Sequence, residues 1–323
     1  MSNTTGAVSL AQVKKGRITL PHFALLYGVD GVGKTSWAAD APKAVFIGTE
    51  QGFGQLDVAR FPTPKNFQEV LATVQLLINE QHDYETLAVD SLDWLEPLVH
   101  RHACEKFGWK NIEDPGYGKG YVAANDAWLE LIGLLKRLRQ KMNVILIAHA
   151  TIKTFTDPEQ NVAYDRYQLK LAGSGAKTDA SALWREAVDC VLFANFEVST
   201  TQAKGERKAK AFGDGSRVLY TERRPAFDAK NRYSLPFELP LSWEEYAKAC
   251  EATGASAEDE VKQLAAALKG HEANALAWLV GKGWINEKQD LPDLAANHRR
   301  RILNNPEGFI TTITPKTSTQ QGE

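Results

Sequence analysis

Short apolar runs alternate with longer segments of helical spacing between residues 20 and 200. The runs predict five strands, at 22–28, 43–50, 86–91, 143–150 and 187–198, and a further run at 217–223 predicts an antiparallel edge strand. Each run is nearly continuous in apolar residues, which is typical of parallel strands covered by helices on both faces of a sheet. Strands that alternate with helices in this way predict an α/β fold with a mostly parallel central sheet.

The pattern changes after this region. Residues 251–258 are small, polar or acidic, which predicts a linker that follows a core spanning 1–250. Beyond the linker, apolar residues recur at spacings of three and four, so a small helical domain is expected over 259–312. Residues 313–323 are mostly polar and are expected to form a disordered tail.

The charge balance limits the possible partners. Lys and Arg number 38 and Asp and Glu number 40, so the net charge of −2 gives the whole molecule no general attraction to polyanions. Any contact with nucleic acid must therefore be local. No apolar run approaches the roughly 18 residues that a membrane-spanning helix requires. Together with a hydrophobic content of 43%, these features predict a globular protein of the cytoplasm that has no membrane partner.

A glycine-rich loop follows the first predicted strand. It has the pattern G-x-x-x-x-G-K-S/T and comprises Gly28, Val29, Asp30, Gly31, Val32, Gly33, Lys34, Thr35 and Ser36. In such a loop the backbone N–H groups surround phosphates, the lysine reaches the outer phosphates, and the hydroxyl binds Mg²⁺. The loop therefore predicts binding of ATP together with Mg²⁺. The alternative is a glycine turn that binds no ligand.

Acidic residues end two of the predicted strands. Asp90 ends the third run, in the position of a carboxylate that holds the metal ion during nucleotide hydrolysis. Ser91 follows it where many ATPases carry the glutamate that polarises water, so the base must lie elsewhere. Glu50 ends the second run at the same edge of the sheet and is the predicted base, unless it is merely solvated. Asp93 is the second candidate base, although its helical setting predicts that it caps the helix or faces solvent.

Three segments in this order, "GVDGVGKTSW", "KAVFIGTEQGFGQLD" and "TLAVDSLDWL", resemble the RecA family of recombination ATPases. With "GYGKGY", "IAHAT" and "PAFDAKNRYSLP" they are similar, more closely, to the compact RecA-core ATPases of bacteriophages, some of which assist annealing of single-stranded DNA. The resemblance covers about residues 15–245 and implies a RecA-like P-loop core, which for a phage protein would work in the cytoplasm of a bacterial host. It also implies that Glu50 is catalytic, because the family's catalytic glutamate closes the second strand.

The resemblance suggests roles for two further segments. His149 occupies the position at which RecA proteins carry a glutamine that senses the terminal phosphate and moves a DNA-binding loop, and a structural histidine is the alternative. A long polar loop is expected at 151–177, and "DPGYGKGYV" at 114–122 occupies the place of the family's first DNA loop. Basic residues interleaved with aromatic ones suit single-stranded nucleic acid, and flexible surface loops are the alternative. The candidate residues are Tyr117, Lys119, Tyr121, Lys153, Arg166, Tyr167, Lys170 and Lys177.

The segment 204–232 concentrates basic residues, with nine basic and four acidic side chains. We expect Lys230 and Arg232 to reach across a subunit boundary and stabilise charge on a neighbour's phosphates, and Arg217 is a further candidate for this role. A surface that follows the phosphates of DNA and a solvated hairpin are the alternatives.

These features favour an ATPase that acts on single-stranded DNA in recombination, annealing or replication repair. Its expected partners are single-stranded DNA, further copies of the chain in a ring or filament, and a single-strand-binding protein at the C-terminal unit. A P-loop kinase of a small metabolite or nucleotide is the second hypothesis, because Arg223 and Arg224 resemble the arginines of a kinase lid. A nucleotide switch or assembly protein that does not hydrolyse ATP is the third.

Overall fold

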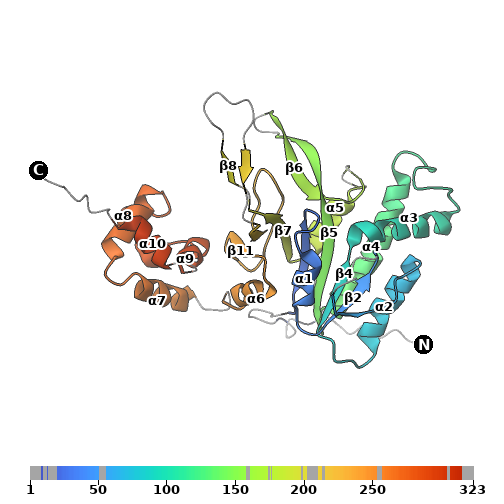
Figure 1. Ribbon diagram of the computed structural model, residues 1–323, viewed down its shortest axis with the longest axis horizontal. Coiled ribbons are helices and arrows are strands. Elements are labelled where there is room, and N and C mark those ends of the chain that lie inside the picture. The colour runs from blue at the N-terminus through green and yellow to red at the C-terminus, as the bar shows by residue number, and fades with distance from the viewer. Residues whose placement is uncertain are drawn as a thin grey trace, which may run out of the picture.

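The computed structural model describes residues 9, 13, 20–50, 56–157, 161–173, 175, 177–197, 199–201, 210–212, 215–252, 257–303 and 306–314. Within these residues nine strands form one sheet in the order β11-β10-β7-β1-β5-β4-β2-β3, with β6 paired to β5 (Figure 1). The parallel strands are β1 (Phe23–Gly28), β2 (Ala44–Gly48), β3 (Ala59–Arg60), β4 (Thr86–Asp90), β5 (Asn143–Thr156) and β7 (Cys190–Phe196). The predicted α/β fold with a mostly parallel sheet is therefore confirmed.

Helices cover both faces of the sheet, as the apolar strands require. They are α1 (Lys34–Ala39), α2 (Phe67–Asn79), α3 (Leu92–Phe107), α4 (Lys119–Leu138), α5 (Ala180–Ala187) and α6 (Trp243–Ala252). On one face α2, α3, α4 and α5 bury residues such as Phe67, Trp128 and Trp184. On the other face α1 and α6 bury Trp37 and Tyr246. The two apolar layers hold the carboxyl ends of β1, β2, β4 and β5 at one edge of the sheet.

Local sequence explains where the longer helices begin and end. In α2 the Asn66 side chain accepts a hydrogen bond from the Glu69 backbone N–H, and Glu69 in turn accepts one from the Lys65 N–H, which stabilises the first turn. The apolar positions of α2 then recur at spacings of three and four, so that one face is buried. Helix α3 ends at Gly108, whose φ of 71° is the left-handed conformation that terminates many helices.

The antiparallel edge differs from the sequence prediction. β10 (Arg217–Tyr220) is antiparallel as predicted and pairs with β7, but β11 (Glu238–Pro240) pairs with β10 and forms the edge. A short ribbon of β8 (Ser199–Thr201) and β9 (Lys210–Phe212) lies between β7 and β10 in the sequence.

The predicted loop at 151–177 is largely a β-hairpin, which corrects the prediction. β5 does not end at residue 150 but continues to Thr156, and β6 (Ala163–Leu169) pairs antiparallel with this extension. The hairpin extends beyond the neighbouring strands (Figure 1), and most residues of the β5 extension at 151–156 are exposed. Polar residues can therefore occupy both faces of its strands, and an apolar run is a poor guide to such a strand.

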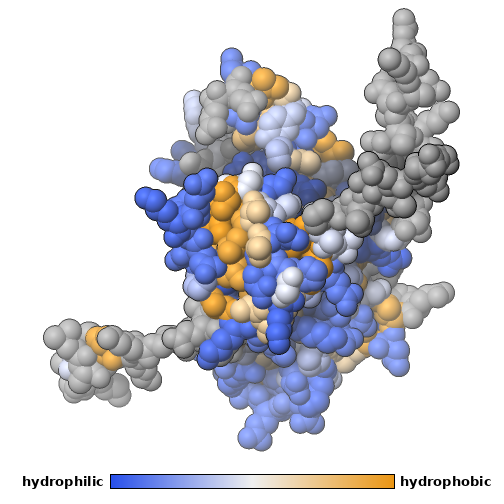
Figure 2. Space-filling model, turned by 90° about the vertical axis from the view of Figure 1, so that its left-hand side faces the viewer, coloured by the Kyte–Doolittle hydropathy of each residue, from blue (hydrophilic) through white to orange (hydrophobic). Residues whose placement is uncertain are grey.

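The C-terminal helices form an apolar cluster of their own. They are α7 (Ala257–Ala267), α8 (Glu272–Gly281), α9 (Ala296–Leu303) and α10 (Pro306–Ile313), with a 3-10 turn at Leu291–Asp293. Their cluster contains Leu264, Leu279 and Ile302, separate from the two clusters on the sheet. Figure 2, which views the molecule from the side of these helices, shows hydrophobic residues gathered between hydrophilic ones. Among the described residues, no helix is long and apolar enough to cross a membrane.

Candidate nucleotide site

The register of the sheet brings the predicted site residues to one edge. Gly28 at the end of β1 lies opposite His149 on β5, and Gly48 at the end of β2 lies opposite Asp90 on β4. Glu50 follows Gly48 by two residues. Carboxyl ends of parallel strands are where ligands bind in open α/β sheets. The glycine loop, both predicted acids and the histidine thus share one edge.

The glycine loop encloses the amine of Lys34. Its Nζ donates hydrogen bonds to the carbonyl oxygens of Gly28 at 3.1 Å and Val29 at 3.0 Å, and the residue is 6% exposed. Gly31 and Gly33 have φ values of 71° and 102°, which residues with a side chain rarely adopt. Burial lowers the pKa of Lys34, and nearby carboxylates oppose that effect. The ammonium group therefore lies inside the curve of the loop, where a phosphate chain would meet it.

Thr35 and Asp90 form the centre of the predicted metal site. The Thr35 hydroxyl donates to Asp90 Oδ2 at 2.7 Å, and Asp90 is 2% exposed. Burial raises the pKa of Asp90, while the hydrogen bond from Thr35 lowers it. In the described part of the chain, no group of three or more His, Cys, Asp or Glu residues is arranged to hold a metal ion. One carboxylate and one hydroxyl fit Mg²⁺, which takes its remaining oxygens from nucleotide phosphates and water.

Glu50 is half-buried beside this pair. Burial raises the pKa of Glu50, and the neighbouring carboxylates of Asp90 and Asp93 raise it further, while His149 and Lys34 oppose them. The Glu50 carboxylate is therefore close enough to Lys34 of the glycine loop and to Asp90 of the predicted metal site to interact electrostatically with both. A carboxylate with a raised pKa at such a position suits a general base.

His149 is held by Asp93, which corrects the expectation for Asp93. Rather than facing solvent, the Asp93 side chain is 4% exposed and accepts two hydrogen bonds from His149, from the backbone N–H at 3.0 Å and from Nδ1 at 2.9 Å. Burial alone would raise the pKa of Asp93, but the bonds from His149 outweigh it and lower the pKa. The same bond raises the pKa of His149. Nε2 of the ring is directed toward Asp30 of the glycine loop, at 3.7 Å.

A family model covers the part of the chain that contains these residues. The model of the AAA domain matches residues 21–233, which is more than half of the chain. The chain belongs to the AAA domain family. Comparison with curated proteins finds no match. The chain is accordingly a P-loop ATPase, and its AAA domain contains every residue of the site described above.

A second acid on α3 contacts the segment that follows β6 in the AAA domain. Both carboxylate oxygens of Glu96 accept the backbone N–H of Ala172, at 2.9 and 3.1 Å. The Lys170 N–H in turn donates to the His149 carbonyl at 3.0 Å. Burial raises the pKa of Glu96 to about 7, although the bond from Ala172 opposes this. Asp93 and Glu96 therefore connect one face of α3 to β5 and to the end of the hairpin.

Replacing Glu96 with glutamine is expected to stabilise the protein above neutral pH. A carboxyl group whose pKa rises on folding from 4.5 to about 7 contributes stability at low pH, and this contribution is lost as the pH rises through that window. Glutamine still accepts the Ala172 N–H but does not ionise. We expect Glu96→Gln to exceed the wild type by up to about 3 kcal/mol near pH 8 and by much less near pH 5. Urea unfolding at both pH values measures this, with exposed Glu130→Gln on α4 as the control. A difference that does not depend on pH would contradict it.

The two segments predicted to contact nucleic acid lie side by side in the AAA domain. Asn125 Nδ2 donates to the Lys177 carbonyl at 3.1 Å, and a Cβ on Gly118 would lie 3.1 Å from the Thr178 side chain. Tyr117 lies between two glycines with left-handed φ values and is fully exposed. Lys119, Lys153, Lys170 and Lys177 are exposed as well. Tyr121 is half-buried, and its hydroxyl donates to Glu113.

Two of the candidate residues for nucleic acid are not free, which corrects their place in that set. Arg166 is 3% exposed, and its guanidinium donates to Asp228 Oδ1 at 2.5 Å. Tyr167 is half-buried and packs on Phe193, with 5.1 Å between ring centroids. The two residues are consecutive on β6 and therefore face opposite sides of the hairpin. Each is covered by a partner from another segment, Asp228 for Arg166 and Phe193 for Tyr167.

Lys230 and Arg232 lie at the opposite edge of the sheet. Lys230 pairs with Val191 at the start of β7, and its Nζ donates to the Arg185 carbonyl. Arg232 donates to Asp189 Oδ1 at 3.0 Å. Neither side chain approaches the glycine loop of its own chain, so their predicted role toward a neighbouring subunit stays a prediction.

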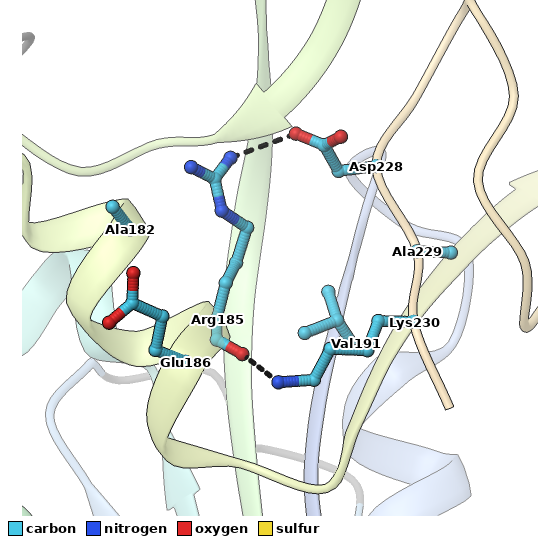
Figure 3. Close-up of a pocket in the computed structure, with 7 residues that line it drawn as sticks. All are labelled: Ala182, Arg185, Glu186, Val191, Asp228, Ala229 and Lys230. Carbon is cyan, nitrogen blue, oxygen red and sulfur yellow. Dashed lines mark hydrogen bonds and ion pairs between the residues drawn. The ribbon is translucent and has the colours of Figure 1, made fainter. Parts of the chain in front are cut away.

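Lys230 also lines a pocket of about 240 Å³ between α5 and β7 (Figure 3). Arg185 projects into it and donates to Asp228 Oδ2 at 2.8 Å. The lining residues are Ala182, Arg185, Glu186, Val191, Asp228, Ala229 and Lys230. Of the two contacts that Figure 3 marks by dashed lines, one is the ion pair between Arg185 and Asp228, and the other joins the Lys230 amine to the backbone carbonyl of Arg185.

Proposed function

We propose that this ATPase is RecA-like and acts on single-stranded DNA in recombination, annealing or replication repair. The observation that carries the proposal is the position of His149. Its strand, β5, lies between β1, which leads into the glycine loop, and β4, which ends at Asp90. Beyond His149 the same strand continues into the hairpin, so one element joins the nucleotide edge to the basic and aromatic segments.

Each residue of the nucleotide edge has a role in this proposal. Lys34 and the loop N–H groups hold the phosphates of ATP, and Thr35 and Asp90 hold Mg²⁺. Bound Mg²⁺ neutralises charge on the phosphate oxygens. Glu50 orients the attacking water and accepts its proton. His149, held by Asp93, donates from Nε2 toward the terminal phosphate and transmits its presence along β5.

The DNA surface is assigned to the exposed residues of the two adjacent segments. Tyr117 offers a free ring for stacking on a base, and Lys119 and Lys177 offer cations for the backbone phosphates. Lys153 and Lys170 extend this basic surface along the hairpin. The negative net charge of the whole chain requires such a local surface.

We further propose that the chain assembles into a ring or filament. Lys230 and Arg232 would then face the phosphates of a neighbouring subunit, and Arg232, whose side chain is 60% exposed, could exchange its bond to Asp189 for one to phosphate. The separate cluster of α7–α10 is the proposed site for a single-strand-binding protein.

The proposal is tested by Mg²⁺-dependent ATP turnover with and without an unstructured single-stranded oligonucleotide. We expect the oligonucleotide to raise turnover severalfold and Lys34→Ala to abolish it, since the loop lysine contacts the reacting phosphates. Tyr117→Ala should weaken the DNA effect and leave basal turnover unchanged, because its ring touches no part of the nucleotide edge.

Two other results would overturn the proposal. If DNA did not change ATP turnover and phosphate were transferred to an added nucleoside or nucleotide, the protein would be a kinase. Tight ATP binding without turnover would identify a nucleotide switch.

A further inference from the structure

Arg217 reaches the nucleotide edge from β10. It is the first residue of that strand and pairs with Phe196 near the end of β7. Two residues earlier on β7, Ala194 lies opposite Gly28, where the glycine loop begins. Arg217 therefore lies at the carboxyl edge of the parallel strands, on the side of β1 away from Asp90.

The guanidinium group of Arg217 lies against the glycine loop. A Cβ on Gly33 would be 2.8 Å from its Nη1, closer than real Cβ atoms approach other atoms. The space beside Gly33 that a side chain would occupy is thus taken by the guanidinium. The Phe196 ring lies 6.0 Å from the guanidinium carbon and helps to position it. The contact needs no neighbouring subunit.

The charges of the site favour a second cation at this position. Lys34 is surrounded by the carboxylates of Asp30, Glu50, Asp90 and Asp93, so the loop has more negative than positive groups before a triphosphate binds. Within the described residues, no ion pair joins Arg217 to a carboxylate, and the residue is exposed. In contrast, Arg139, Arg166, Arg185 and Arg232 each pair with an aspartate.

We propose that Arg217 binds the phosphates of the ATP held in the glycine loop of its own chain. A guanidinium presents several N–H donors in one plane, which matches two phosphate oxygens at once. The guanidinium also adds positive charge next to Lys34, where the four carboxylates outweigh the single ammonium group. This role differs from that of Lys230 and Arg232, which lie at the far edge of the sheet and would act on a neighbour's nucleotide.

Competition binding on the full-length protein tests the proposal. The displacement of a fluorescent ATP analogue by a non-hydrolysable ATP analogue and by inorganic tripolyphosphate is measured for wild type, Arg217→Ala and Arg217→Lys. We expect Arg217→Ala to weaken both competitors by about tenfold, because each loses charge-assisted hydrogen bonds. Arg217→Lys should recover part of the loss, since it keeps the charge but not the planar donors. Arg101→Ala, which removes an exposed arginine on α3, is the matched control and should change neither affinity.

The outcomes separate phosphate binding from its alternatives. Weaker binding of the ATP analogue with unchanged binding of tripolyphosphate would overturn the proposal and assign the guanidinium to the base or ribose. Unchanged binding of both would also overturn it. Mixing Arg217→Ala protein with Lys34→Ala protein, which retains Arg217, tests whether Arg217 binds ATP in its own chain or in a neighbouring one. If it restores ATP binding to Arg217→Ala, Arg217 acts on a neighbouring subunit and the proposed contact within one chain is wrong.

Discussion

Replacing Glu50 with glutamine is expected to lower kcat for ATP hydrolysis at least about a hundredfold while ATP binding changes by less than about threefold. Glutamine has the size of glutamate and can hold a water molecule, but it cannot accept the proton. The carboxylate is half-buried, and burial together with Asp90 raises its pKa, which strengthens it as a base. The carboxylate accepts the proton only in the transition state, and no contact with bound ATP is assigned to Glu50. ATP binding should therefore persist in the variant.

Single-turnover hydrolysis and equilibrium binding of ATP measure the two effects separately. Glu130→Gln, an exposed change of the same kind on α4, is the control and should behave as wild type. Wild-type turnover in Glu50→Gln would show that the base lies elsewhere. Asp93 would be a poor substitute, because its bonds from His149 outweigh burial and lower its pKa.

The fold was predictable from the sequence where burial imposes a simple pattern. The central strands are apolar on both faces because helices cover both, so runs such as 22–28 stand out without any knowledge of their partners. The glycine loop was equally visible, because its chemistry is contained in consecutive residues. The extension of β5 carries polar residues on both faces, and such a pattern predicts a loop rather than a strand.

Parts of the candidate site depend on partners far away in the sequence. Asp93 has the helical surroundings of a solvated residue, and only the end of β5, at His149, explains why it is buried. Glu96 accepts a hydrogen bond from the backbone N–H of Ala172. Every residue except proline has such a donor, so the residue type at 172 does not reveal the contact. The burial of Arg166 likewise depends on Asp228, which the chain supplies 62 residues later.

One signal in the sequence could have pointed to these contacts. Asp93, Glu96 and His100 recur at spacings of three and four on α3, so they share one face of the helix. That face meets His149, Ala172 and the ring of Tyr121, which belong to three different segments. Polar side chains that lie beside the buried face of a helix indicate polar partners opposite them, since unpaired buried polar groups are costly. Helix α3 thereby connects the nucleotide edge to both proposed DNA segments.

Replacing Asp90 with asparagine should separate stability from activity. We expect Mg²⁺-dependent turnover to fall at least about a hundredfold, because the neutral amide is a poor ligand for Mg²⁺. The metal-free protein should nevertheless be more stable than wild type at neutral pH. Burial raises the pKa of Asp90, so its contribution to stability is present below the ordinary value of 3.8 and is lost as the pH rises through the folded value. Asparagine avoids this loss and can still accept the Thr35 hydroxyl.

Thermal unfolding with and without ATP and Mg²⁺ distinguishes the two effects. A ligand that binds only the folded state raises Tm, so wild type should gain stability from ATP with Mg²⁺ and Asp90→Asn should gain much less. Asp126→Asn, an exposed change on α4, controls for the loss of one charge. If Asp90→Asn kept both turnover and the full gain in Tm, the metal ion would be held elsewhere. If Asp90→Asn were less stable than wild type without ligand, the prediction would be wrong. The buried carboxylate would then stabilise the fold itself, and metal binding would not be the reason for its burial.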